Sequence, residues 1–158
     1  MDKNYEFFLR KYKFYLSDHV STYAYCLNPN HFHLLIKTRS EDVSGQLRKF
    51  FQSYALSINK QEDRTGSLFR KNFRRILIED DVYLKWLVFY IHFNPEKHKI
   101  IHDYRNYSYS SYNNYQSDSA GIICRNEVFE WFGDQVSFFE FHSYHHEEKR
   151  FEDKGYQL

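Results

Sequence analysis

Two β-prone runs joined by a turn constrain this chain more than any other feature of its sequence. Residues 22–27 and 31–37 are short runs of β-prone residues, and the turn-forming trio Asn-Pro-Asn separates them at 28–30. This pattern predicts a β-hairpin. On the second strand, His31 and His33 lie two residues apart, so their rings leave the same face with Cα atoms roughly 6.5 to 7 Å apart. Two imidazoles placed in this way can bind one metal ion.

The bare His-X-His pair leaves two interpretations open. Nine of the 158 residues are histidines, so two of them can fall two positions apart by chance. Surface or partly buried rings are then the simpler explanation. The motifs that follow in the chain favour a metal site.

Length and charge favour one domain with a C-terminal extension. A chain of 158 residues and 19.5 kDa suits a single core. Residues 1–126 carry 19 Lys and Arg against 13 Asp and Glu, a balance of +6, whereas residues 127–158 carry 3 against 8, a balance of −5. We therefore expect a basic domain at 1–118 and an acidic extension at 119–158. A basic domain suits a polyanionic partner such as nucleic acid.

Cysteine use and hydropathy predict a cytoplasmic protein. Cys26 and Cys124 are too few for a disulfide framework and form no Cys-X-X-Cys pair. No run approaches the ~20 apolar residues of a membrane span, and the N-terminus lacks the apolar stretch of a signal peptide. We expect no membrane partner.

Apolar periodicity predicts the other elements. Apolar residues recur at helical spacing over 5–16 and 47–58. An acidic N-cap at Asp80 or Asp81 opens a further helix, and Pro95 is expected to end it. The expected order is helix 4–16, strands 22–27 and 31–37, helix 40–58, strand 73–78, helix 81–95, an extended connection over 104–119, and a short helix within 122–141.

A basic cluster precedes the predicted strand at 73–78. Arg70, Lys71, Arg74 and Arg75 place four cations within six residues, with no acidic residue among them. Guanidinium and ammonium groups in this density are suited to DNA phosphates. The alternative is a solvated charge run beside a strand.

Three motifs carry a resemblance to a known family. Cys-Leu-X-Pro-Asn precedes the His-hydrophobe-His pair, Gly66 begins a Gly-X-Leu-Phe stretch followed by basic residues, and Tyr90 begins Tyr-Ile-X-X-Asn-Pro. Together they resemble the HUH single-tyrosine transposases, and most of all the REP-associated tyrosine transposases and the related small insertion-sequence enzymes. One departure is Asn28, where the family usually has Met, at a turn position that we expect to tolerate a polar residue.

The resemblance implies a site and a reaction. Tyr90 would be the nucleophile, and His31, His33 and Asn94 would hold Mg²⁺ or Mn²⁺. Spacing supports this assignment independently, because Tyr90 and Asn94 are four apart and share one helix face, whereas His92 lies about 200° away and is expected to face elsewhere. The implied reaction cuts and rejoins single-stranded or hairpin DNA through a 5′-phosphotyrosine.

The family fold implied by the resemblance is α+β, a ferredoxin-like antiparallel sheet with helices packed on one face. Family members begin with a strand that this chain lacks before its first helix. We therefore expect the strand bearing His31 and His33 to lie at a sheet edge, unless another segment or a second chain, as in a homodimer, pairs with it.

Three functions remain open from the sequence. The first is an active transposase that acts through Tyr90. The second is an inactive or truncated relative that only binds DNA. The third is a metal-dependent phosphodiesterase that uses water and forms no covalent intermediate. The acidic extension also contains His142, His145 and His146. These histidines could bind a metal, but we expect them to lie at a solvated end of the chain.

Overall fold

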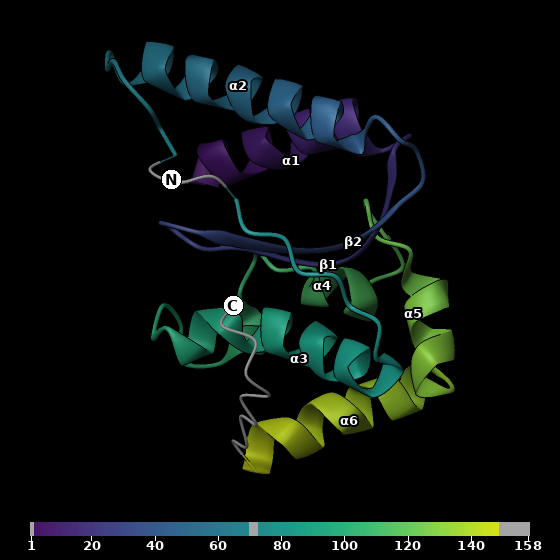
Figure 1. The fold of residues 1–158 in the computed structure, drawn as a ribbon. Helices are drawn as coiled ribbons and strands as arrows, with labels where there is room; N and C mark the ends of the chain where they lie inside the picture. The colour runs from purple at the N-terminus through teal and green to yellow at the C-terminus, as the bar shows by residue number, and fades with distance from the viewer. Residues whose placement is uncertain (1, 70–72, 149–158) are drawn as a thin grey trace.

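The computed structural model describes residues 2–69 and 73–148, and it has the predicted α+β class (Figure 1). Its core is a two-stranded antiparallel hairpin with helices packed around it. The elements are α1 Asp2–Leu16, β1 Val20–Leu27, β2 Phe32–Thr38, α2 Val43–Gln61, α3 Asp81–Lys97, the 3-10 helix η1 Tyr104–Asn106, α4 Tyr112–Gln116, α5 Arg125–Phe132 and α6 Gln135–Glu148.

The predicted hairpin is confirmed, and its turn places the two histidines as expected. The Asn28 backbone N–H donates to the His31 carbonyl at 2.9 Å and closes the turn. In the β1–β2 register, Leu27 lies opposite Phe32 and Cys26 lies opposite His33. Since successive residues of a strand point to opposite faces, Phe32 and His33 lie on opposite sides of the sheet.

Helices α1 and α2 cover one side of the hairpin (Figure 1). The aromatic stripe of α1 packs here, with Phe8 lying 5.3 Å from Phe32 of β2 and 4.9 Å from Phe50 of α2 between ring centroids. Tyr12 is buried, and its hydroxyl bonds Thr22 of β1 at 2.7 Å. The apolar residues that predicted these helices therefore form the part of the core between the hairpin and helices α1 and α2.

Helix α3 covers the other side, together with α4, so helices lie on both faces of the hairpin rather than on one, and α6 packs against α3 on the side away from the hairpin (Figure 1). The Asp80 side chain caps α3 by accepting from the Tyr83 N–H at 2.9 Å. The helix was expected to end at Pro95 but continues to Lys97. Proline only removes one N–H near the helix end, and the His98 N–H still bonds the Asn94 carbonyl at 3.0 Å.

The two edges of the hairpin differ. The outer edge of β1 receives two later segments, because Leu27 N–H bonds the Tyr109 carbonyl at 2.9 Å and Cys124 N–H bonds the Thr22 carbonyl at 2.8 Å. Over the ranges 2–69 and 73–148, β2 pairs with β1 alone. Residues 104–119, predicted as an extended connection, instead contain η1 and α4.

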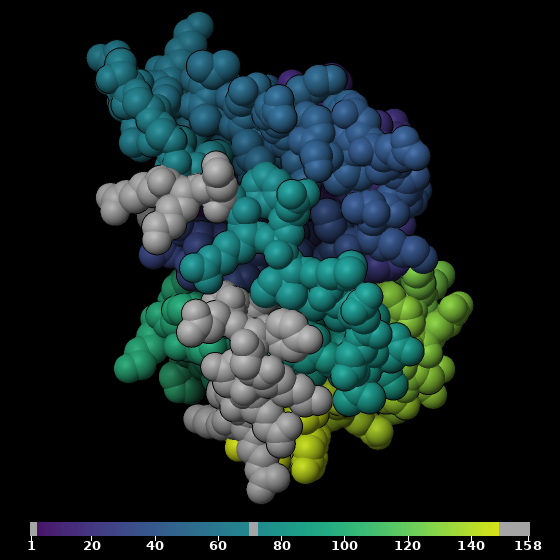
Figure 2. Space-filling model, viewed as in Figure 1, coloured from purple at the N-terminus to yellow at the C-terminus, as the bar shows by residue number. Residues whose placement is uncertain are grey.

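The predicted strand at 73–78 is wrong. These residues form an irregular segment that leads to α3 from the side of α1 and α2, and it lies at the surface of the molecule (Figure 2). Phe73 is 43% exposed and Leu77 is 79% exposed. A β-prone run becomes a strand only when a neighbouring edge offers hydrogen bonds, and none of the described residues pairs with it.

The C-terminal part packs into the same core. Ile123, Val128 and Phe138 are buried in the hydrophobic cluster that includes the hairpin. The single helix predicted within 122–141 is interrupted at Gly133, whose φ of 101° suits glycine and separates α5 from α6. The boundary predicted at residue 118 stays a prediction. None of the described helices combines the length and the hydrophobicity needed to cross a bilayer.

Candidate active site

One face of α3 meets the end of the hairpin that carries the histidines. Tyr90 and Asn94 lie on this face, one helical turn apart. Asn94 Oδ1 lies 3.1 Å from His31 Nε2, and the Tyr90 and His33 rings are 6.1 Å apart between centroids. The structure therefore brings the four residues predicted for the nucleophile and the metal into one cluster, although their chemical roles stay predictions.

Asn28 is a member of this cluster that the sequence did not reveal. Its side chain is buried in the turn, and its Nδ2 lies 2.5 Å from Asn94 Oδ1 and 2.9 Å from His31 Nε2. The side chain turns inward, so Asn28 contributes polar contacts to the cluster. The expectation that this turn position tolerates a polar residue stays a prediction. The sequence signal that could have revealed Asn28 was its departure from the family motif, in which this position is usually Met.

The tautomer of His31 follows from its neighbours. His31 Nδ1 lies 2.7 Å from Asn30 Oδ1, which can only accept, so Nδ1 carries the proton. In the neutral ring, Nε2 then holds a lone pair. Both this lone pair and that of Asn94 Oδ1 face the Asn28 NH₂ group, which donates to the two acceptors.

His33 is held as a neutral ring. Burial is the main cause that lowers the pKa of His33 to about 4, and the neighbouring His31, His98 and Lys97 contribute in the same direction. The His31 ring lies 5.2 Å from that of His33 and 4.9 Å from that of His98 between centroids. Neutral imidazole is the form that binds metal ions.

Tyr90 is nearly buried and has a cationic neighbour. Its ring stacks on Trp86 at 5.2 Å between centroids, and only 5% of the residue is exposed. Lys97 Nζ donates to Tyr90 Oη at 3.1 Å and lies 4.5 Å from the ring centroid. Lys97 is seven residues after Tyr90 on the same helix face, a spacing that could have revealed it in the sequence.

Asn94 has an unused donor. The residue is completely buried, and its Nδ2 has no hydrogen-bond partner within residues 2–69 and 73–148. A buried unpaired amide is unfavourable by roughly 1 to 3 kcal/mol. Such a group in a native fold needs an explanation, and a bound ligand is one.

The structure locates only part of the predicted DNA-binding cluster. Arg70 and Lys71 lie outside the described residues. Arg74 and Arg75 are exposed on the segment between α2 and α3, and Arg75 Nη1 donates to Ser44 Oγ at 3.5 Å. Their role in phosphate binding stays a prediction.

The donor set fits a hard or borderline divalent ion. In the described part of the chain, no three His, Cys, Asp or Glu side chains form a group that could hold a metal. The predicted set combines two imidazoles with an amide oxygen. Two of its donors, His31 Nε2 and Asn94 Oδ1, are 3.1 Å apart with lone pairs facing one NH₂ group. Nitrogen and oxygen ligands of this kind suit Mn²⁺ and, less well, Mg²⁺.

The opposite face of α3 contains a second histidine cluster. His92 and His142 are fully buried, and His92 Nδ1 lies 3.0 Å from His142 Nε2. His92 Nε2 contacts Ser111 Oγ at 2.8 Å, and His142 Nδ1 contacts the Phe138 carbonyl at 2.8 Å. His92 faces away from Tyr90, as predicted. The expectation of a solvated end is wrong for His142, because α6 packs onto α3.

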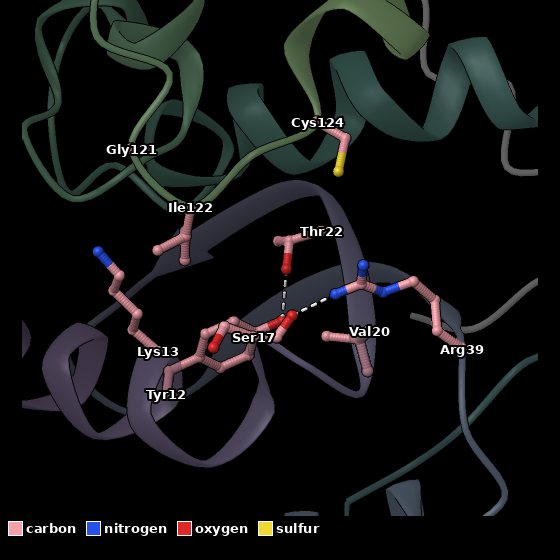
Figure 3. Close-up of a pocket in the computed structure, with 9 residues that line it drawn as sticks. All are labelled: Tyr12, Lys13, Ser17, Val20, Thr22, Arg39, Gly121, Ile122 and Cys124. Carbon is pink, nitrogen blue, oxygen red and sulfur yellow. Dashed lines mark hydrogen bonds between the residues drawn. The ribbon is translucent and has the colours of Figure 1, made fainter.

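A cavity of about 190 Å³ lies elsewhere, near the open end of the hairpin (Figure 3). Val20 and Thr22 of β1, Tyr12 of α1 and Cys124 line it. Arg39 donates to the Ser17 carbonyl at its rim. None of the predicted site residues lines this cavity, so it does not extend the cluster around Tyr90.

The comparisons with known proteins give a distant relative. The chain is 28% identical over 102 residues to a Haemophilus influenzae protein named "Putative REP-associated tyrosine transposase", and the match covers 58% of each chain. The chain thus spans somewhat more than half of that relative. No protein-family profile matches the sequence. No solved structure matches the fold.

Proposed function

We propose that this protein is a DNA transposase that uses Tyr90 as its nucleophile and a divalent ion held by His31, His33 and Asn94. The observation that carries the proposal is the meeting of Tyr90 and Asn94 on α3 with the two histidines of the hairpin. The name of the H. influenzae relative supports the same class.

The chain supplies several groups for attack on a phosphodiester. Tyr90 Oη would form a bond to phosphorus while the bond from phosphorus to the 3′ oxygen breaks. The phenol loses one proton and the 3′ oxygen gains one, so the products are a 5′-phosphotyrosine and a free 3′ hydroxyl. Lys97 Nζ, already hydrogen-bonded to Tyr90 Oη, would stabilise the negative charge that the deprotonating oxygen acquires.

The imidazoles of His31 and His33 and the amide of Asn94 would hold the ion. When bound, Mg²⁺ or Mn²⁺ supplies Lewis-acid polarisation of the phosphate. Asn94 Nδ2, a buried donor without a partner among the described residues, can bind a phosphate oxygen or a water next to it. Exposed Arg74 and Arg75 would contact the backbone of single-stranded or hairpin DNA.

The proposal is tested by covalent capture. The protein is incubated with Mn²⁺ and a single-stranded oligonucleotide that carries a hairpin and a label on each side of it, and adducts are resolved under denaturing conditions. We expect a labelled adduct at the 5′ end of the cut, and we expect Tyr90→Phe to abolish it. Tyr83→Phe, on the same helix but outside the cluster, serves as the matched control and should retain the adduct.

A second candidate is DNA binding without cleavage. It is favoured by the Asn28 amide, which occupies the space between His31 Nε2 and Asn94 Oδ1. Metal-independent binding of the hairpin oligonucleotide, with no adduct under any metal, would establish this second function. Release of a free 5′ phosphate without an adduct would instead indicate hydrolysis by water.

A further inference from the structure

The Asn28 side chain lies where two electron-pair donors converge. Its Nδ2 contacts Asn94 Oδ1 at 2.5 Å and His31 Nε2 at 2.9 Å, and these two acceptors are 3.1 Å apart. Two acceptors at this separation repel each other unless a positive group lies between them. The partly positive NH₂ hydrogens of Asn28 fill that role in the fold.

The spacing of the three atoms is also that of ligands around one ion. An octahedral ion with ligands at about 2.1 Å separates adjacent ligands by about 3 Å. The three separations of 2.5, 2.9 and 3.1 Å lie near this value. One change is needed, because an NH₂ group cannot coordinate a cation and a carbonyl oxygen can.

We infer that Asn28 is a further ligand of the metal site: its NH₂ group closes the site when no ion is bound, and rotation of the amide presents Oδ1 to the ion. This inference rests on the proposed function, since it concerns the same metal. The rotation turns about the Cβ–Cγ bond, a broad torsion with a low barrier. Within residues 2–69 and 73–148, the hydrogen bond that Asn28 Oδ1 accepts comes from the Cys26 thiol at 3.5 Å, and a thiol is a weak donor.

The amide ligand changes the character of the site. With Asn28, the oxygen donors number two, from Asn28 and Asn94, beside the imidazoles of His31 and His33. Both amides are neutral, so the site brings no formal charge to the ion. We therefore expect modest affinity and a preference for Mn²⁺ over Mg²⁺.

The test measures metal binding rather than activity. Mn²⁺ binding to the full chain is followed by calorimetry for the wild type, Asn28→Leu, Asn28→Asp and Asn106→Leu. Asn106 is an exposed asparagine in η1, so its variant is the matched control. We expect Asn28→Leu to weaken Mn²⁺ binding by about tenfold or more, Asn28→Asp to strengthen it about tenfold through the added charge, and Asn106→Leu to change nothing.

A second measurement follows the amide itself. The side-chain NH₂ signals of Asn28, identified by their loss in Asn28→Leu, should move when Mg²⁺ is added to the wild type. Equal Mn²⁺ affinity in the wild type and both Asn28 variants, with unmoved NH₂ signals, overturns the role of Asn28 and leaves the proposed function intact. Absence of any Mn²⁺ binding in the wild type overturns both. Thermal melts without metal show that each variant is folded.

Discussion

The two faces of α3 carry histidine clusters that differ in how completely their polar atoms are satisfied. On one face, a single set of tautomers satisfies every group: Ser111 donates to His92, His92 donates to His142, and His142 donates to the Phe138 carbonyl. Toward the hairpin, two lone pairs from His31 and Asn94 share one NH₂ group, and Asn94 Nδ2 has no partner in the described ranges.

The difference separates a structural cluster from a candidate functional one. A buried polar network that satisfies itself fixes the position of α6 on α3 and needs no ligand. A buried cluster with convergent acceptors and a spare donor is less stable than it could be, which is typical of sites that bind something. Burial alone does not distinguish the clusters, since His92, His142 and Asn94 are all fully buried.

The strongest test of this contrast is Asn94→Leu. Leucine removes the proposed metal ligand, so we expect adduct formation to fall by about 10³-fold. It removes both the acceptor of one Asn28 hydrogen and a buried donor that has no partner among the described residues, and because these effects oppose each other the free energy of unfolding should change by less than about 1 kcal/mol. Adduct yield and urea denaturation measure the two effects. If Asn94→Leu forms the adduct at the normal level but has a lower free energy of unfolding, Asn94 has a structural role and no role in the reaction.

The reverse pattern is expected for His142→Leu. This change removes the acceptor of His92 Nδ1 in a dry core, so the protein should lose about 2 to 3 kcal/mol of stability. Mn²⁺ affinity should stay the same. The exposed His102→Ala variant is the control and should remain within about 0.5 kcal/mol of the wild type in chemical denaturation.

Acid should destabilise the protein through the same pair. Burial lowers the pKa of His142 to about 3 and lowers that of His92 well below its usual value. Below pH 6.5 the unfolded chain binds protons that the folded chain does not, so stability falls as pH drops, by up to about 1.4 kcal/mol per pH unit for each group. For His142 the loss ends near pH 3. Urea midpoints at pH 7.5, 6 and 5 should therefore decrease, and equal midpoints would contradict the neutral pair.

Lys97→Met tests whether the hydrogen bond from Lys97 to the Tyr90 hydroxyl assists the reaction. Methionine keeps the length of the side chain but removes the donor at 3.1 Å from Tyr90 Oη. We expect the rate of adduct formation to fall about tenfold, with Mn²⁺ affinity unchanged. Lys97→Arg should recover part of the rate. An unchanged rate in Lys97→Met would show that the contact is incidental.

The smallest expected effect concerns the exposed cations. Replacing Arg74 and Arg75 together by alanine should weaken single-stranded DNA binding a few-fold. The slope of log affinity against log salt should become shallower by about 1.4, because each lost phosphate contact accounts for about 0.7. Fluorescence anisotropy at several salt concentrations measures both. An unchanged slope would indicate a solvated charge run.

The sequence by itself determined the local elements and the candidate residues. The hairpin, the first three helices and the shared face of Tyr90 and Asn94 follow from periodicities of two and 3.6 residues, which depend on near neighbours alone. The turn trio at 28–30 likewise fixed where the hairpin reverses. These features depend on residues close together in the sequence, so they can be predicted without knowledge of the tertiary structure.

Only the tertiary structure decided which of these elements meet and what the side chains contact. The pairing of His92 with His142 joins residues 50 positions apart, and the failure of residues 73–78 to form a strand depends on the edges around them. The inward turn of Asn28 onto Asn94 depends on the docking of α3 beneath the hairpin. Strand pairing and side-chain burial are non-local, because they require surfaces that exist only after the chain has packed.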